Sequence, residues 1–155
     1  MANRRSSRSD QLELRQYAAC GLDNVYLLVE PSVSHELEIE NEEALIRRIA
    51  RILTRQTSNL NGKEVLFLRK YLKFTQEKLS ELIGVSTQTI ARYEKGISSI
   101  SGSEDIVLRL LVSGMSISMN IQKEIEFIKS YNSRPDRYIF SRQGNEWVLV
   151  DDERA

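Results

Sequence analysis

The sequence predicts a mainly α fold with small β elements, and three observations lead to that prediction. Apolar residues recur at helical spacing in several segments between residues 42 and 114, each introduced by a residue type that caps helices. Short runs in which apolar and polar residues alternate lie near both ends of the chain. Between Thr75 and Gly96, two short helical segments are separated by a turn that contains Gly84, which is the layout of a helix-turn-helix. We therefore expect a helix-turn-helix bundle with short terminal strands and a hairpin.

Four regions are expected along the 155 residues. Residues 1–16 are predicted to be a flexible basic tail, because Arg4, Arg5 and Arg8 occur there without the apolar segment of a secretory signal. Such a tail is either disordered or an arm that contacts phosphate groups. The other regions are a strand-and-helix region at 17–60, a helix-turn-helix domain at 61–114, and a C-terminal helix and hairpin at 115–155.

The N-terminal strands are predicted from alternation and from turn residues. Leu12 and Leu14 alternate with polar residues in the segment 11–17, and the apolar run Val25–Val29 follows a turn-forming segment. This pattern predicts a strand, a turn and a second strand. Alternation over residues 33–39 indicates a third edge strand or an extended loop.

Capping residues mark the starts of the predicted helices. Asn41 precedes two glutamates and an apolar stripe, and it is expected to cap a helix that runs to about residue 56. Asn61 with Glu64, and Ser101 with Glu104, have the spacing of capping boxes at the starts of two further helices. In the first of these two helices, the residues expected to pack beneath the helix-turn-helix are Leu66, Phe67 and Tyr71.

The C-terminal region is expected to contain a helix and a hairpin. Three isoleucines would share one face of a helix between residues 119 and 131. The segments 138–141 and 146–150 flank a turn of composition Arg-Gln-Gly-Asn, which predicts a β-hairpin. Trp147 and Val148 are its candidate packing residues.

The helix-turn-helix segment presents two different sides. Thr75 and Ser86 are positioned to cap its two helices, and Ile90 and Tyr93 fall on one side of the second helix. The opposite side carries no carboxylate and contains Gln88, Ala91, Arg92 and Lys95. Gln can pair bidentately with adenine and Arg with guanine, so this side suits the edges of DNA bases.

Two other interpretations of this segment stay open. The polar side of the second helix is alternatively an ordinary solvated face, or the fold is retained for structure alone. The net charge of zero permits the latter, because affinity for DNA depends largely on Lys and Arg. The distribution of charge favours DNA binding, since seven Lys or Arg and only four Glu lie between residues 62 and 96.

Residues 62–114 resemble the helix-turn-helix family of phage-repressor and antitoxin type, often called Xre-like, which has a λ-repressor-like bundle. The resemblance implies that Gln76, which opens the first reader helix, touches the DNA backbone or a base. It also implies that the early residues of the second helix face the groove and that Arg92 matches a base-reading position. The full set of expected DNA contacts is Gln76, Lys78, Ser86, Thr87, Gln88, Thr89, Arg92 and Lys95.

A second and longer resemblance is to the MqsA/YgiT-type antitoxins. It spans residues 17–114 and includes the motif CGLDNVYL within residues 20–28, the helix at 42–56 and the helix-turn-helix. Those antitoxins carry paired CxxC zinc ligands upstream, whereas this chain has one cysteine, Cys20. The resemblance therefore implies DNA binding. Toxin neutralisation, which depends largely on the zinc module, does not carry over.

Composition argues against several other classes. No apolar run approaches the length of a membrane span, and a single cysteine forms no internal disulfide, so we expect a cytoplasmic protein without a membrane partner. His35 is the sole histidine, too few good donors for a metal site. No nucleophile elbow, phosphate loop or HExxH spacing occurs. Neither catalytic residues nor a cofactor is expected, and the protein is not expected to be an enzyme.

The expected partner is double-stranded DNA, read as an inverted repeat by a homodimer. One recognition helix reads few base pairs, so specific affinity usually needs two half-sites about 34 Å apart. The terminal strands and the helix at 119–131 are the candidate dimer surface, and we expect an autorepressor. The alternative is an antitoxin-like module, because six Glu and no Lys or Arg occupy residues 30–43. That acidic segment is either a solvated face or a surface for a basic partner such as a ribonuclease toxin.

Overall fold

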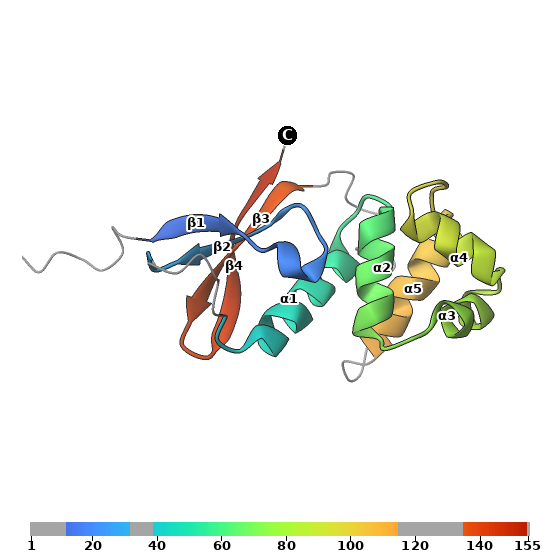
Figure 1. Cartoon of the computed structure of the whole chain (residues 1–155), viewed down its shortest axis with the longest axis horizontal. Helices are drawn as coiled ribbons and strands as arrows, with labels where there is room; N and C mark the ends of the chain where they lie inside the picture. Colours follow the sequence, from blue (N-terminus) through green and yellow to red (C-terminus); the bar gives the residue numbers. More distant parts are fainter. Residues whose placement is uncertain (1–11, 32–38, 115–134, 155) are drawn as a thin grey trace, which may run out of the picture.

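A computed structural model of the chain describes residues 12–31, 39–114 and 135–154 (Figure 1). Its elements in chain order are β1 (Glu13–Gln16), the 3-10 helix η2 (Ala18–Cys20), β2 (Val25–Val29), α1 (Glu42–Arg55), α2 (Gly62–Tyr71), α3 (Gln76–Ile83), α4 (Thr87–Glu94), α5 (Gly102–Gly114), β3 (Pro135–Gln143) and β4 (Glu146–Arg154). The expected mainly α fold with small β elements is confirmed. Of the flexible tail predicted at 1–16, residues 1–11 lie outside the described residues, and residues 13–16 form strand β1 instead. Most of the segment 33–39 and the helix expected at 119–131 also lie outside the described residues.

The four strands form one sheet in the order β1-β2-β3-β4 (Figure 1). β1 and β2 pair antiparallel, with Leu14 opposite Leu28. β3 and β4 form the predicted antiparallel hairpin, whose turn contains Gly144 at a φ of 63° that suits glycine. β2 and β3 pair in parallel, with Val25 opposite Tyr138. Strands near the two ends of the chain, predicted only as separate elements, are thus joined in a single sheet.

Helix α1 packs between the sheet and the helical bundle (Figure 1). It buries Leu45, Ile49 and Leu53 in a hydrophobic core that receives side chains from both parts. Trp147 of β4 is buried in the same core, and its indole nitrogen donates to the carbonyl of Glu40 at 3.2 Å. The predicted packing role of Trp147 is therefore confirmed, and the hairpin is fixed to the segment that leads into α1.

The prediction that Asn41 caps α1 is wrong. Asn41 has a φ of 57° and a ψ of 48°, a left-handed conformation, and its side chain makes no capping hydrogen bond. A capping side chain needs an extended backbone at its own residue. The Asn41 amide instead donates from Nδ2 to the carbonyl of Asn145, in the turn between β3 and β4, at 2.9 Å. The residue therefore connects the start of α1 to the hairpin.

Helices α2 to α5 form the bundle, and their apolar sides meet in the core that α1 shares. Val65 and Leu68 of α2, Leu79 of α3, Ile90 of α4 and Leu108 of α5 are each at most 1% exposed. None of the helices in the described segments is long and apolar enough to cross a membrane.

Helix α2 begins at the predicted capping box. Asn61 Oδ1 accepts a hydrogen bond from the Glu64 backbone N–H at 2.9 Å, and Glu64 Oε2 accepts from the Asn61 backbone N–H at 2.8 Å. Of the three side chains expected beneath the helix-turn-helix, Phe67 is buried in the core that also contains Leu79 and Ile90, and Tyr71 packs partly against that core. Both of them and Leu66 also line a hollow that α2 forms with η2 and α1.

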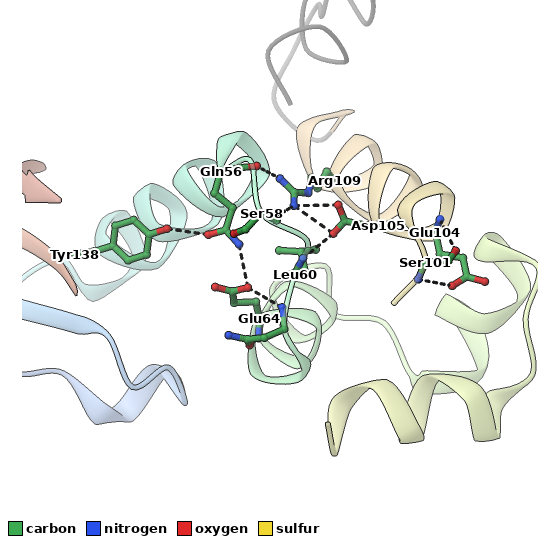
Figure 2. A network of polar contacts seen from close by, with 10 residues as sticks. Gln56, Ser58, Leu60, Glu64, Ser101, Glu104, Asp105, Arg109 and Tyr138 are labelled. Atoms are coloured by element: carbon green, nitrogen blue, oxygen red, sulfur yellow. Dashed lines mark hydrogen bonds and ion pairs between the residues drawn. The ribbon is translucent and has the colours of Figure 1, made fainter. Parts of the chain in front are cut away.

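A buried polar network connects the sheet with α1, α2 and α5 (Figure 2). Tyr138 of β3 donates from Oη to Gln56 Oε1 at 2.8 Å, and Gln56 Nε2 donates to Glu64 Oε2 at 2.9 Å. Arg109 of α5 forms an ion pair with Asp105 at 2.9 Å and donates to the carbonyl oxygen of Gln56. Buried polar groups are stable only when they are paired, so this network holds the linker between α1 and α2 in one conformation.

Candidate nucleic-acid interface

The helix-turn-helix consists of α3, α4 and the turn between them. At the start of α3, Thr75 Oγ1 accepts from the Lys78 backbone N–H at 3.0 Å, and at the start of α4, Ser86 Oγ accepts from the Thr89 backbone N–H at 3.1 Å. Gly84 ends α3 at a φ of 83°, a left-handed conformation that glycine adopts without strain. Both predicted caps and the glycine turn are confirmed.

The two sides of α4 divide as the sequence predicts. Ile90 is fully buried and Tyr93 is 8% exposed, and both belong to the core together with Leu79 of α3. Gln88 and Arg92 lie about one helical turn apart, and both are exposed. α4 therefore presents two long polar side chains from a backbone that the core holds in place.

The hydroxyl groups near the start of α4 have partners within the protein. Ser86 Oγ lies 2.8 Å from Thr89 Oγ1, and Thr87 Oγ1 lies 3.2 Å from Ser80 Oγ of α3. A hydroxyl group can make more than one hydrogen bond, so these contacts leave capacity for another partner. Their effect in the free protein is to hold the start of α4 against α3.

Gln76 belongs to a buried brace, formed with Arg69 and Glu94, that connects α2, α3 and α4. Arg69 donates from Nε to Glu94 Oε1 at 2.5 Å and from Nη2 to Glu94 Oε2 at 3.1 Å, and Gln76 Nε2 donates to Glu94 Oε2 at 2.7 Å. The side chains of Arg69 and Glu94 are 13% and 6% exposed, so the ion pair is largely shielded from water. A side-chain amide has two N–H donors. The bond to Glu94 uses one of the two donors of Gln76.

Burial changes the charge balance on the surface of the bundle. Of the four Glu between residues 62 and 96, Glu64 is buried in the polar network and Glu94 in the brace, which leaves Glu77 and Glu81 exposed. The exposed cations in the same range are Lys63, Lys70, Lys73, Lys78, Arg92 and Lys95. The surface is thus more basic than the sequence alone indicates, which suits a polyanionic partner.

A second contact fixes the C-terminal end of α4 to α5. Tyr93 Oη donates to Glu104 Oε2 at 2.6 Å, and the same oxygen accepts from the Ser101 backbone N–H at 3.1 Å. The hydrogen bond to Glu104 raises the pKa of Tyr93 to about 12, and the same bond lowers the pKa of Glu104. α4 is therefore held to α2 through Glu94 and to α5 through Tyr93.

The sequence reasoning missed the positioning role of Arg69 and Glu94. In the sequence, both residues contribute only to the charge balance of the bundle, because no local pattern indicates that residues 25 positions apart are paired. One signal in the sequence points to a buried Glu94. It lies four residues after Ile90, so the two side chains share the face of the helix that is turned toward the core.

Comparison with known proteins bears on this part of the chain. Residues 67–104, from within α2 to the first turn of α5, match the family model described as Helix-turn-helix. No curated protein matches the chain, and no solved structure matches it. The narrower resemblance to the MqsA/YgiT antitoxins stays a prediction. The family match agrees with the helix-turn-helix that the structure shows within residues 67–104, and it supports a DNA-binding regulatory role for them.

Proposed function

We propose that this protein is a sequence-specific transcription regulator that binds an inverted repeat as a homodimer and represses its own promoter. The observation that carries the proposal is the exposed polar side of α4, where Gln88 and Arg92 project from a helix anchored by Glu94 and Tyr93. A helix anchored in this way can enter the major groove without prior rearrangement.

The proposed contacts divide into base reading and phosphate binding. Gln88 and Arg92 have the donor and acceptor patterns that pair with adenine and guanine, and each good pair discriminates by about 1–3 kcal/mol. Lys78 and Lys95 are proposed to contact phosphates, which orient the protein without reading sequence. Further contacts are proposed for Gln76, Ser86, Thr87 and Thr89.

The proposed homodimer follows from the small size of the reading surface. α4 has eight residues, and one such helix reads few base pairs, so two copies are needed at half-sites about 34 Å apart. β1 and β4 are the outer strands of the sheet. These strands and the helix predicted at 119–131 are the proposed sources of the dimer surface.

Selection of bound sites from random DNA, followed by fluorescence anisotropy on the selected site, tests the proposal. We expect an inverted repeat and an affinity that falls steeply as the salt concentration rises. Gln88→Ala and Arg92→Ala should each relax the sequence preference, by about 1–3 kcal/mol at separate positions. Lys78→Ala should weaken binding to all DNA alike and lower the salt slope by about one. Arg51→Ala, at an exposed arginine of α1, is the matched control.

Two results would contradict different parts of the proposal. If no salt-dependent DNA binding occurs at low ionic strength, the helix-turn-helix is retained for structure alone. If the preferred site is unchanged in both Gln88→Ala and Arg92→Ala, the assignment of base-reading residues is rejected while DNA binding stands.

An antitoxin-like role, in which the acidic segment 30–43 neutralises a basic toxin, is the second candidate. Three of its glutamates have partners within the protein: Glu40 with Arg142, Glu42 with Tyr17, and Glu43 with Arg47. The side chains of Glu40 and Glu43 are nevertheless 72% and 88% exposed, so a basic partner can compete for them. A small basic protein that copurifies with the chain, and is lost on charge reversal of Glu36, Glu38 and Glu40, would support the second candidate.

A further inference from the structure

A hollow of about 280 Å³ lies between η2, α1 and α2. Cys20 lines it beside η2, Ile46 lines it from α1, and α2 contributes apolar side chains that include Leu66 and Phe67. The hollow is located where the sheet part of the molecule meets the bundle, and none of its lining residues belongs to α3 or α4. It is therefore separate from the proposed DNA contacts.

Two lysines give the hollow its charge. Lys63 and Lys70 lie about two turns apart on α2 and both line the hollow, whereas none of its lining residues is an Asp or Glu. The Lys63 ammonium group lies 2.5 Å from Asp23 Oδ2, which holds it at the rim. Within the described part of the chain, Lys70 pairs with no carboxylate. The hollow thus combines an apolar surface with positive charge.

The cysteine in the wall beside η2 carries no negative charge. Cys20 Sγ donates a weak hydrogen bond to the carbonyl of Tyr17 at 3.3 Å. Burial raises the pKa of the Cys20 thiol, so the sulfur stays protonated at neutral pH. The thiol itself therefore does not repel an anion. Two carboxylates act on it from this side, and each has a partner: Asp23 pairs with Lys63, and Glu42 accepts a hydrogen bond from Tyr17.

We propose that this hollow binds a small organic anion, a carboxylate or sulfonate carried on an aromatic or short aliphatic body. The apolar side chains cover the body, and the ammonium groups of Lys63 and Lys70 bind the charged group. The volume lies just below the usual range for ligand pockets, which suits a small ligand of roughly a dozen non-hydrogen atoms. The proposal does not assume DNA binding.

Indole-3-acetate is a suitable probe because it has this chemistry, and indole-3-acetamide keeps the same ring system without the charge. Each probe is titrated into the nitrogen-15-labelled full chain, and the backbone amide signals are followed by NMR. We expect indole-3-acetate to shift the signals of residues 19–21, 46 and 63–71. It should bind at least about fivefold more tightly than indole-3-acetamide.

Variants of the two lysines test the source of the charge preference. Lys70→Met should weaken indole-3-acetate binding by about threefold to tenfold without changing indole-3-acetamide binding. Lys63→Met should act in the same direction and more strongly, because it also leaves Asp23 unpaired at the rim. Lys73→Met, at an exposed lysine outside the hollow, is the matched control and should leave both affinities unchanged.

Three results would overturn the proposal. They are the absence of any shift at millimolar probe, equal affinity for the two probes, and shifts confined to residues outside the hollow. Normal indole-3-acetate affinity in the variant with both lysines replaced would overturn it as well. The comparison of the two probes uses the unmodified protein, so it decides the outcome even if a variant fails to fold.

Discussion

At the residue scale, Gly62 is a position where the backbone of α2 closely approaches that of α4. A Cβ atom at this residue would lie 2.3 Å from the carbonyl oxygen of Tyr93 and 3.0 Å from that of Glu94. Both are backbone atoms of a helix, which cannot rotate away as a flexible side chain can. The contact between two helices, rather than an unusual backbone angle, therefore requires glycine at this position.

Gly62→Ala is expected to lower the free energy of unfolding by about 1–3 kcal/mol, the usual cost of overpacking. The better helix propensity of Ala offsets this loss by at most about 1 kcal/mol. Gly102→Ala is the matched control, because open space surrounds that glycine at the start of α5. Urea unfolding followed by circular dichroism measures both variants. Equal stability of the two would contradict the close approach of α2 and α4.

The hydrogen bond between Tyr93 and Glu104 links stability to pH. It lowers the pKa of Glu104 in the folded state, so folding favours the ionised carboxylate. The resulting stabilisation is fully present above the pKa of an unfolded glutamate, about 4.3, and is lost as the pH falls through the lower pKa of the folded state. Glu104→Gln and Tyr93→Phe should both flatten the fall in unfolding free energy below about pH 5.

Urea unfolding at a series of pH values measures this dependence. Between about pH 6 and pH 8 the slope of unfolding free energy against pH should be the same in wild type and both variants, because Glu104 is ionised and Tyr93 is neutral in both states there. If the unfolding free energy of Glu104→Gln fell as steeply below pH 5 as that of the wild type, other carboxylates would be responsible for the acid dependence.

At the scale of elements, the brace of Arg69, Glu94 and Gln76 fixes α4 relative to α2 and α3. Its ion pair is largely shielded from water, whereas the pair of Lys78 and Glu81, 3.6 Å apart on α3, has side chains that are 54% and 63% exposed. The two ion pairs have the same charges but differ in exposure to water, so comparing them measures how burial changes the contribution of an ion pair to stability.

Arg69→Met is expected to lower the free energy of unfolding by about 3 kcal/mol, because it leaves the buried Glu94 carboxylate without its cation. The double variant Arg69→Met, Glu94→Gln should recover part of this loss, since no uncompensated charge is then buried. Lys78→Met should cost less than about 1 kcal/mol. A cost for Arg69→Met as small as that for Lys78→Met, in the same urea experiment, would show that the brace does not hold α4.

Helix starts could be predicted from the sequence where the capping contact is local. Asn61, Thr75 and Ser86 each bond to a backbone group three residues further along the chain, a spacing that the sequence displays directly. Asn41, like Asn61, is an asparagine directly before a helix, but its side chain forms a hydrogen bond with Asn145, which is 104 residues away. Local patterns cannot rank such a distant partner above the nearby helix.

The candidate site could be predicted in part for the same reason. Helical periodicity places Gln88 and Arg92 opposite Ile90, so the exposed side of α4 follows from spacing alone. The brace could not be predicted, because Arg69 and Glu94 come together only when α2 packs against α4. The hollow beside α2 likewise depends on how η2 and α1 pack.

At the scale of the whole molecule, one hydrophobic core runs from the sheet through α1 into the bundle. It contains Phe140 of β3, Leu53 of α1 and Leu68 of α2, among others. The polar network from Tyr138 through Gln56 crosses the same junction. Unfolding of either part would expose apolar surface and unpaired polar groups of the other, which makes separate unfolding costly.

We therefore expect a single unfolding transition for the whole chain. Trp147 is the only tryptophan and reports on the sheet by fluorescence, whereas far-ultraviolet circular dichroism reports mainly on the helices. The two signals should share one midpoint and one slope in urea. Tyr138→Phe, which removes the hydrogen bond to Gln56, should move both signals together by about 1 kcal/mol. A tryptophan transition at lower urea than the helical transition would contradict a common core.

The parallel pairing of β2 with β3 also sets an order of events on the ribosome. β2 ends at Val29 and β3 begins at Pro135, so about a hundred residues are synthesised between them. At about 5–20 residues per second, β2 waits roughly 5–20 s for its neighbour, while the helices of the bundle emerge. The unpaired edge of β2 can meanwhile pair with β3 of another nascent chain. Dense translation of one message would therefore favour strand-exchanged dimers.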